Sequence, residues 1–98
     1  MNFRFIVKQI ALNELKEIRY WYESQRSGLE YDFSICINNS TKLIKQMPYA
    51  YPLIYKNIRR APVKRFPYKI YYIAEDFSIS VLSIFHNSRD FNAWKKLH

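Results

Sequence analysis

The sequence predicts an α+β fold in the order β-α-α-β-β-β: a helical hairpin packed on a small, mainly antiparallel sheet, with a short C-terminal helix. Two observations predict it, because apolar residues recur at helical spacing in the first half and aromatic and β-branched segments fill the second. The 98 residues fit one domain, residues 1–98. Aromatic residues, at 18%, each bury roughly 150–250 Å², so one core suffices without disulfides.

The chain is expected to begin with a strand and a helix. Apolar residues alternate from Phe3 to Val7, which predicts a short strand. A helix is expected from about Ile10 to Gln25, because apolar side chains fall on one stripe. That stripe consists of Ala11, Leu15, Ile18 and Tyr22, widened by Leu12 and Trp21. The polar side of the helix carries Glu14, Lys16, Glu17, Arg19 and Glu23.

A second helix should follow at once and form an antiparallel hairpin with the first. The sequence Ser27-Gly28-Leu29-Glu30 matches a capping box, with Ser27 as N-cap and Glu30 reaching back to its amide. Pro48 should stop this helix. Its buried stripe is predicted to be Leu29, Phe33, Cys36, Ile37, Ser40, Ile44 and Met47.

Three strands are expected next, at 53–61, 66–74 and 78–86, and a short helix over about 90–96. The last strand is apolar on both faces, which is typical of a central, covered strand. Strict alternation places Ile79, Val81 and Phe85 on one face, and Leu82 and Ile84 on the other.

The net charge of +8 resides in one part of the chain. Residues 33–74 hold no Asp or Glu but eight cations: Lys42, Lys45, Lys56, Arg59, Arg60, Lys64, Arg65 and Lys69. A single-sign field attracts polyanions. Aromatic residues among these cations, such as Tyr55, Phe66 and Tyr68, favour nucleic-acid binding over a merely solvated face.

The composition excludes several kinds of site. One glycine rules out a Gly-rich phosphate loop, and one cysteine with two histidines rules out a Cys/His metal cluster, so no metal or cofactor is expected. The first residues lack a signal peptide's pattern, and no apolar run is long enough to cross a membrane. We therefore expect a cytoplasmic protein without a membrane partner.

Two C-terminal residues, His86 and Trp94, have two interpretations each. His86 ends the last strand, either as a structural side chain or with Arg89 at the rim of the sheet beside the cationic strands. Trp94 belongs either to the core or to the lip of a binding groove.

These residues together resemble the RelE/ParE superfamily of bacterial toxins from type II toxin–antitoxin systems, over nearly the whole chain. The matching segments are Ala11-x-x-Glu14-Leu15-x-x-Ile18, Tyr22-Glu23-x-Gln25-x-x-Gly28-Leu29, Pro48-x-x-Tyr51-Pro52, Arg59-Arg60, Arg65-Phe66-Pro67-Tyr68-Lys69-Ile70-Tyr71-Tyr72 and His86-x-x-Arg89-Asp90-x-x-x-Trp94. The resemblance implies a small basic toxin that is neutralised by a cognate antitoxin carrying an acidic segment, and operator DNA contacted through that complex.

The resemblance leaves the target open. Its Arg65–Tyr72 and His86–Asp90 segments look more like the ParE branch, whose members bind DNA gyrase. Whichever the target, the residues expected to bind it, or nucleic acid, are Lys56, Arg59, Arg60, Lys64, Arg65, Tyr68 and Trp94.

Two alternatives remain. RelE-like members are metal-independent, ribosome-dependent mRNA endonucleases, and Lys64, Arg65, Lys69 and Arg89 stand where those members keep cations. Their C-terminal catalytic Tyr has no counterpart in residues 91–95, so His86 would have to move the proton. The second alternative is an inactive or regulatory member that is retained for antitoxin or DNA binding.

Overall fold

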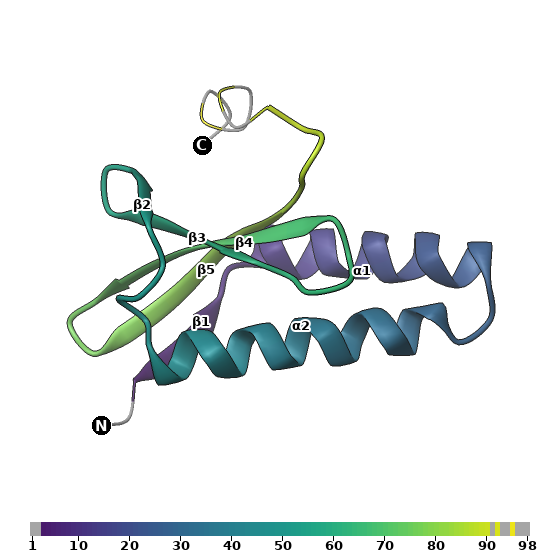
Figure 1. Ribbon diagram of the computed structural model, residues 1–98, viewed down its shortest axis with the longest axis horizontal. Helices are drawn as coiled ribbons and strands as arrows, with labels where there is room; N and C mark the ends of the chain where they lie inside the picture. Colours follow the sequence, from purple (N-terminus) through teal and green to yellow (C-terminus); the bar gives the residue numbers. More distant parts are fainter. Residues whose placement is uncertain (1–2, 91, 93–94, 96–98) are drawn as a thin grey trace.

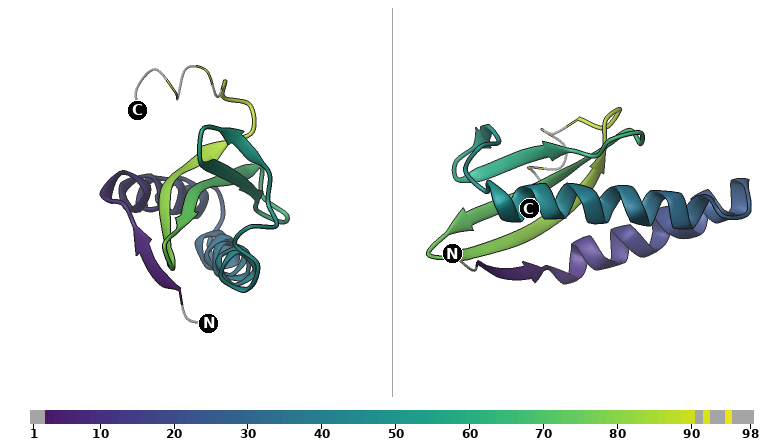
Figure 2. Two further views of the ribbon diagram at one scale, coloured as in Figure 1. Left: turned by 90° about the vertical axis from the view of Figure 1, so that its left-hand side faces the viewer. Right: turned by 60° about the horizontal axis from the view of Figure 1, so that its bottom comes forward.

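The structure, a computed structural model, describes residues 3–90, 92 and 95. Its elements are β1 (Arg4–Val7), α1 (Gln9–Gln25), α2 (Leu29–Gln46), β2 (Leu53–Tyr55), β3 (Ile58–Pro62), β4 (Tyr68–Glu75) and β5 (Ser78–His86). The two helices lie side by side on one face of the sheet (Figures 1 and 2). The predicted α+β fold with a helical hairpin is confirmed. Most of the predicted C-terminal helix lies outside the described residues, although Asn92 and Lys95 are helical.

The strands pair in the order β1-β5-β4-β3-β2. β1 runs parallel to β5, from Arg4 opposite Ser78 to Val7 opposite Val81, and the other neighbours are antiparallel. The first strand therefore joins the sheet beside the last one. The chain turns into α1 after Val7, so β1 pairs only with the first half of β5, from Ser78 to Val81. Along the β1 edge of the sheet, the second half of β5, up to His86, has no neighbouring strand among the described residues.

The predicted strand over 53–61 is wrong as a single element. The structure divides it into β2 and β3, an antiparallel hairpin that turns at Lys56 and Asn57. Lys56 takes a left-handed backbone conformation, with φ 50°, and the side chain of Asn57 donates a hydrogen bond to Glu75 at 3.2 Å. A continuous apolar run does not reveal such a turn, because its residues suit one long strand equally well.

The helices agree with prediction, but their buried stripes are narrower. Ala11 and Tyr22 are buried, whereas Leu12 and Trp21 are 46% and 55% exposed, so the predicted widening of the first stripe is wrong. Met47 is 64% exposed, since it follows the end of α2 and its φ of −139° leaves the helical path.

The predicted capping box is wrong as well. Gly28, not Ser27, is the N-cap of α2, with φ 89°, and neither residue makes a side-chain cap bond. Instead the Glu23 carboxylate, in the last turn of α1, accepts hydrogen bonds from the N–H groups of Gly28 at 3.1 Å and Glu30 at 3.2 Å. An acid of the preceding helix thus satisfies amides that begin the next one.

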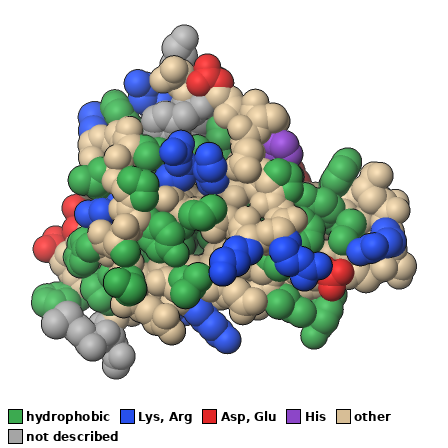
Figure 3. Space-filling model, in the orientation of Figure 1, with side chains coloured by type: hydrophobic (Ala, Val, Ile, Leu, Met, Phe, Trp, Pro, Cys, Tyr) green, Lys and Arg blue, Asp and Glu red, His purple; other side chains and the backbone are tan. Residues whose placement is uncertain are grey.

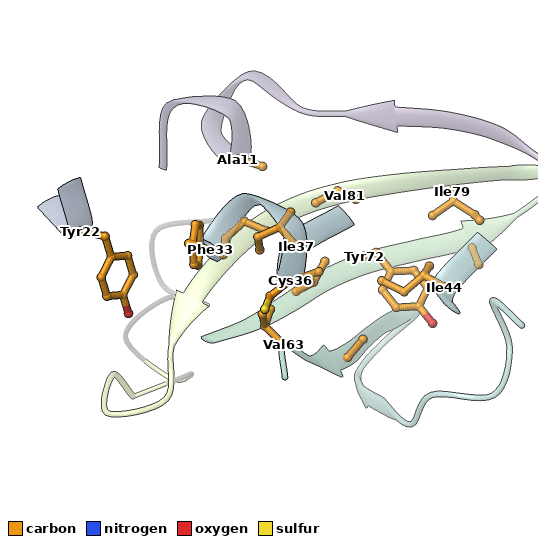
Figure 4. Close-up of a cluster of buried hydrophobic side chains, with 14 residues drawn as sticks. Ala11, Tyr22, Phe33, Cys36, Ile37, Ile44, Val63, Tyr72, Ile79 and Val81 are labelled. Atoms are coloured by element: carbon orange, nitrogen blue, oxygen red, sulfur yellow. The ribbon is translucent and has the colours of Figure 1, made fainter. Parts of the chain in front are cut away.

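The main core lies between the helices and the sheet. Figure 4 shows Phe33, Ile37 and Ile44 of α2 beside Tyr72 and Val81 of the sheet. A second, smaller cluster on the opposite face of the sheet contains Ile58, Tyr71 and Phe85, with Ile54, Tyr55, Ile73 and Leu82 packed against it. We call that opposite face the open face, because neither α1 nor α2 covers it.

A bulge decides which residues of β5 reach each face. Tyr72 pairs with Val81 but Tyr71 pairs with Ser83, so Leu82 is an extra residue. Ile84 consequently joins the core under the helices, and Phe85 joins the smaller hydrophobic cluster on the open face. The predicted faces of these two residues are therefore exchanged, because a one-residue shift inverts the alternation beyond it.

Candidate functional site

The sheet divides the predicted site residues between its two faces. Arg60 lies opposite Tyr71 and Lys69 lies opposite Phe85, on the open face. Arg59, opposite Tyr72, and Tyr68, opposite His86, have the other parity and turn toward the helix side. The two arginines of the Arg59-Arg60 pair thus point to opposite sides, as neighbours in a strand do.

The open face carries cations stacked on aromatic rings. The rings of Tyr71 and Phe85 lie 5.8 Å apart, and the Arg89 guanidinium lies 4.5 Å from the centre of the Phe85 ring. Burial raises the pKa of Tyr71, while the charge of Arg60 and a hydrogen bond from its side chain act in the opposite direction. We call Arg60, Lys69, Tyr71, Phe85 and Arg89 the open-face cluster.

An apolar hollow adjoins this cluster. It has a volume of about 500 Å³, and its lining includes Tyr55, Ile58, Ile73 and Leu82 from the strands. The ammonium groups of Lys56 and Lys95 lie 5.2 and 4.7 Å from the Tyr55 ring centre. The open face therefore combines apolar surface with positive charge, which suits a macromolecular partner that is anionic at its margin.

His86 ends β5 at the rim, as predicted, but its side chain turns away from Arg89. Its ring packs edge-on against Tyr68 at 5.0 Å, on the helix side, whereas Arg89 lies over Phe85 on the open face. Nδ1 of His86 accepts a hydrogen bond from the Ser88 N–H at 3.0 Å and lies 2.7 Å from the Ser88 hydroxyl. His86 is half-buried, and because Nδ1 accepts the hydrogen bond from Ser88, the proton of the neutral ring lies on Nε2.

Tyr68 is part of an aromatic cluster under the hairpin. Its ring lies 5.7 Å from Phe33 and 6.3 Å from Tyr22, and Phe66 packs against the same two rings. Burial, followed by the neighbouring Tyr68 and a hydrogen bond to it, raises the pKa of Tyr22 to about 12. Burial also raises the pKa of Tyr68. Tyr68 was expected to contact the target. Because its ring packs in this cluster and the residue is half-buried, only part of its side chain is accessible to a partner.

Arg59 holds the connection between α2 and β2. Its guanidinium donates hydrogen bonds to the carbonyls of Tyr49 at 3.2 Å and Tyr51 at 2.7 Å, and lies 5.3 Å from the Tyr49 ring centre. The Tyr72 hydroxyl donates to the Pro48 carbonyl at 2.7 Å in the same place. The contacts of Arg59 thus brace this connection, whereas the adjacent Arg60 contacts Tyr71 on the open face.

Lys64 and Arg65 lie in the turn between β3 and β4, exposed, and line a groove together with α2. They are apart from the open-face cluster, so the structure does not gather all the predicted cations into one patch. Trp94 lies outside the described residues. No group of three or more His, Cys, Asp or Glu side chains suited to a metal ion occurs among residues 3–90, 92 and 95.

Two features escaped the sequence interpretation. Glu14, which was placed on the polar side of its helix, is half-buried and hydrogen-bonded to β5. The groove beside α2 is lined by Ile35 and Leu43, a second apolar stripe two helical turns long. The spacing of Ile35 and Leu43 could have indicated this groove, whereas nothing local identifies Glu14.

The fold and the open face define a small basic domain in which a helical hairpin covers one side of a mixed sheet. It is similar to a chain of the chromosomal ParDE toxin–antitoxin system from P. aeruginosa, with a TM-score of 0.76 and 16% identity over 86% of this chain and 95% of that one. It is also similar to a chain of the archaeal RelE-RelB complex from Pyrococcus horikoshii, with a TM-score of 0.56 and 12% identity over 92% and 100%.

These likenesses establish the fold. The predicted RelE/ParE-like architecture is confirmed, and the ParDE structure is the more similar of the two. No protein-family model and no curated protein matches the sequence. Among the described residues, no helix is both long and apolar enough to span a membrane.

Proposed function

We propose that this chain is the toxin of a type II toxin–antitoxin system, which arrests growth by binding an essential target and is neutralised by a cognate antitoxin. The observation that carries the proposal is the likeness to the ParDE chain, which extends over nearly the full length of both proteins. DNA gyrase is the first candidate target, because the ParDE structure is more similar than the RelE-RelB one.

The open-face cluster is the surface we assign to the target. It joins three cations to two aromatic rings on the face opposite the helices. The Arg89 guanidinium, stacked on the Phe85 ring, is held in place for an anionic or polar partner. The acid-free sequence of residues 33–74 supplies the field that steers such a partner toward the protein.

The endonuclease alternative has one specific point in its favour. Nδ1 of His86 is occupied by Ser88, which leaves Nε2 as a proton carrier at the rim of the sheet, close in sequence to Arg89. Against it, the side chains of His86 and Arg89 lie on opposite sides of β5. We therefore rank binding above RNA cleavage.

The experiment that tests the proposal is to express the chain alone in growing bacteria and follow thymidine and amino-acid incorporation over the first minutes. Early loss of DNA synthesis is expected for a gyrase-directed toxin, and early loss of protein synthesis would favour the endonuclease. Undisturbed growth, with folded protein accumulating, would refute a toxin function.

A charge-reversal variant links the effect to the open face. Arg60→Glu/Arg89→Glu should abolish growth inhibition, since it replaces two attractive contacts with two repulsive ones. Arg4→Glu/Lys16→Glu makes the same change in net charge at exposed positions of β1 and α1, and it should remain toxic. Equal loss in both variants would show that net charge, and not this cluster, is what matters.

A further inference from the structure

The apolar hollow beside the open-face cluster lies between the sheet and the junction of β1 with α1. Its volume of about 500 Å³ is within the range of small-molecule binding pockets, roughly 300–1,000 Å³. The strand residues in its lining belong to the smaller hydrophobic cluster of the open face, whereas Lys8 and Ile10 come from the junction. None of the lining residues is a member of the open-face cluster that we assign to the target.

The floor of the hollow is aliphatic and recessed. Ile58 on β3 lies opposite Ile73 on β4, and Leu82 is the extra residue of the bulge in β5. Ile58 is buried, and Ile73 and Leu82 are half-buried. A bulge redirects a side chain, and here it adds Leu82 to the open face. Ile10 of α1, which is 47% exposed, contributes a fourth branched aliphatic side chain.

Positive charge accompanies this floor. Lys8 and Lys95 line the hollow, and none of its described lining residues is acidic. The ammonium groups of Lys95 and Lys56 lie 4.7 and 5.2 Å from the centre of the Tyr55 ring. The salt bridges found among the described residues involve other side chains. The hollow is therefore complementary to an anion that carries an apolar tail.

Positive charge alone does not distinguish the hollow from the rest of the surface. Figure 3 shows Lys and Arg side chains spread among hydrophobic ones over the face that it presents. The groove beside α2 also has cations, but the polar side chains of Asn39, Ser40 and Gln46 lie among its apolar residues. Covering those polar groups with hydrocarbon would cost free energy. In the hollow, Gln9 is the one side-chain amide of the described lining.

We propose that the hollow binds a free medium-chain alkyl carboxylate, with its hydrocarbon chain on Ile58, Ile73 and Leu82 and its carboxylate beside Lys8 and Lys95. Aliphatic side chains favour an alkyl chain, and ammonium groups favour an anionic head group over a neutral one. The inference does not depend on the proposed function, because it rests on the hollow alone.

Three other occupants fit the hollow less well. A membrane surface needs apolar side chains that project from the protein, but the floor is recessed. A nucleotide base needs an exposed ring for stacking, and the Tyr55 ring already has the ammonium groups of Lys56 and Lys95 beside it. A second copy in a two-fold contact would bring the lysines of both copies together, with no acid in the described lining to offset them.

The test is isothermal titration calorimetry of the purified chain with sodium decanoate at an ionic strength of about 0.15 M. Binding should be saturable, with a dissociation constant of about 100 μM or below. Octanoate should bind about sixteenfold more weakly, because each buried methylene group changes affinity about fourfold. Decyltrimethylammonium, which has the same chain length and a cationic head group, should bind at least about tenfold more weakly than decanoate.

Two variants place the ligand in the hollow. Ile10→Asp puts a negative charge into the lining, and Lys8→Glu/Lys95→Glu reverses the charge beside the carboxylate. Each should weaken decanoate binding at least about tenfold. Far-UV circular dichroism checks that each variant is folded, which is expected because Ile10 and Lys8 are exposed.

Each variant has a matched control. Leu12→Asp is the control for Ile10→Asp, because Leu12 is 46% exposed on the same helix but does not line the hollow. Lys16→Glu/Lys42→Glu makes the same change in net charge as the double lysine variant, and Lys42 borders the groove beside α2, so this control also detects binding there. Both controls should change the affinity for decanoate less than about twofold.

Several results would overturn the proposal. These are absence of saturable decanoate binding, equal weakening in a control, and equal binding of decyltrimethylammonium or adenosine monophosphate. Binding to phosphatidylglycerol vesicles that Ile10→Asp abolishes would show a membrane surface instead, and a wild-type dimer that Ile10→Asp dissociates would show self-association. None of these measurements involves growth inhibition, so their failure leaves the proposed function standing, and a chain that binds decanoate without inhibiting growth refutes the proposed function alone.

Discussion

The carboxylate of Glu14 on α1 accepts hydrogen bonds from the hydroxyl of Ser83 on β5, at 2.9 and 3.0 Å to its two oxygens. One of these oxygens also accepts the N–H of Ile84 at 3.2 Å. β1 pairs with β5 only as far as Val81, so Glu14 satisfies the edge of β5 where the neighbouring strand has ended. Ser83 is fully buried. This acid is therefore part of how the hairpin is attached to the sheet.

Glu14→Ala should destabilise the protein by about 1–3 kcal/mol, because it leaves a buried hydroxyl and an amide without their acceptor. Urea denaturation measures this loss. Glu17→Ala is the matched control, since Glu17 is an exposed glutamate on the same helix and its removal should change stability by less than about 0.5 kcal/mol. Equal stability of the two variants would contradict the anchoring role of Glu14.

Gly28→Ala should cost about 1–2 kcal/mol through backbone strain alone. The φ of Gly28 is +89°, and an added Cβ would meet no atom within 4 Å, so crowding contributes nothing. Gly28→Asn should be milder, because Asn tolerates the left-handed region better than Ala. Thermal unfolding of the three proteins gives the order, and an alanine variant as stable as wild type would refute the strain argument.

Alanine substitutions of the adjacent residues Arg59 and Arg60 should have different effects, one on stability and the other on growth inhibition. Arg59→Ala should lower stability by about 1–3 kcal/mol, since it removes the donor to the Tyr49 and Tyr51 carbonyls. Arg60→Ala should lose more growth inhibition than stability, because Arg60 belongs to the open-face cluster. Urea denaturation and growth curves of both variants check this pair. An unfolded Arg60→Ala together with a stable Arg59→Ala would reverse our assignment.

Because of Tyr22, the free energy of unfolding should decrease as the pH rises above 10. Burial raises its pKa to about 12, above the ordinary value of 10.0 that the unfolded chain is expected to keep. Its contribution is complete below pH 10, and stability then falls as the pH rises toward 12, because the unfolded chain releases the proton first. Tyr22→Phe should flatten part of this fall in urea denaturation at pH 8 to 11. An unchanged slope would contradict it.

Local patterns predicted much of the fold. The spacing of Phe33, Ile37 and Ile44 is visible in the sequence and correctly indicates the buried side of α2. The chain turn at Lys56 and the bulge at Leu82 were not predicted from the sequence, because each depends on how one strand pairs with another. The same limit applies to the site, where strand parity separates Arg59 from Arg60, and the turn after β5 places Arg89 on the other side of the sheet from His86.

By itself, the sequence determined the α+β class, the two helices and the concentration of charge in an acid-free segment, since periodicity and composition are properties of neighbouring residues. Only the tertiary structure decided which cations share a surface, that Glu14 anchors α1 to β5, and that a basic apolar groove lies behind α2. These relations join residues far apart in the chain, and strand register and helix packing set them together.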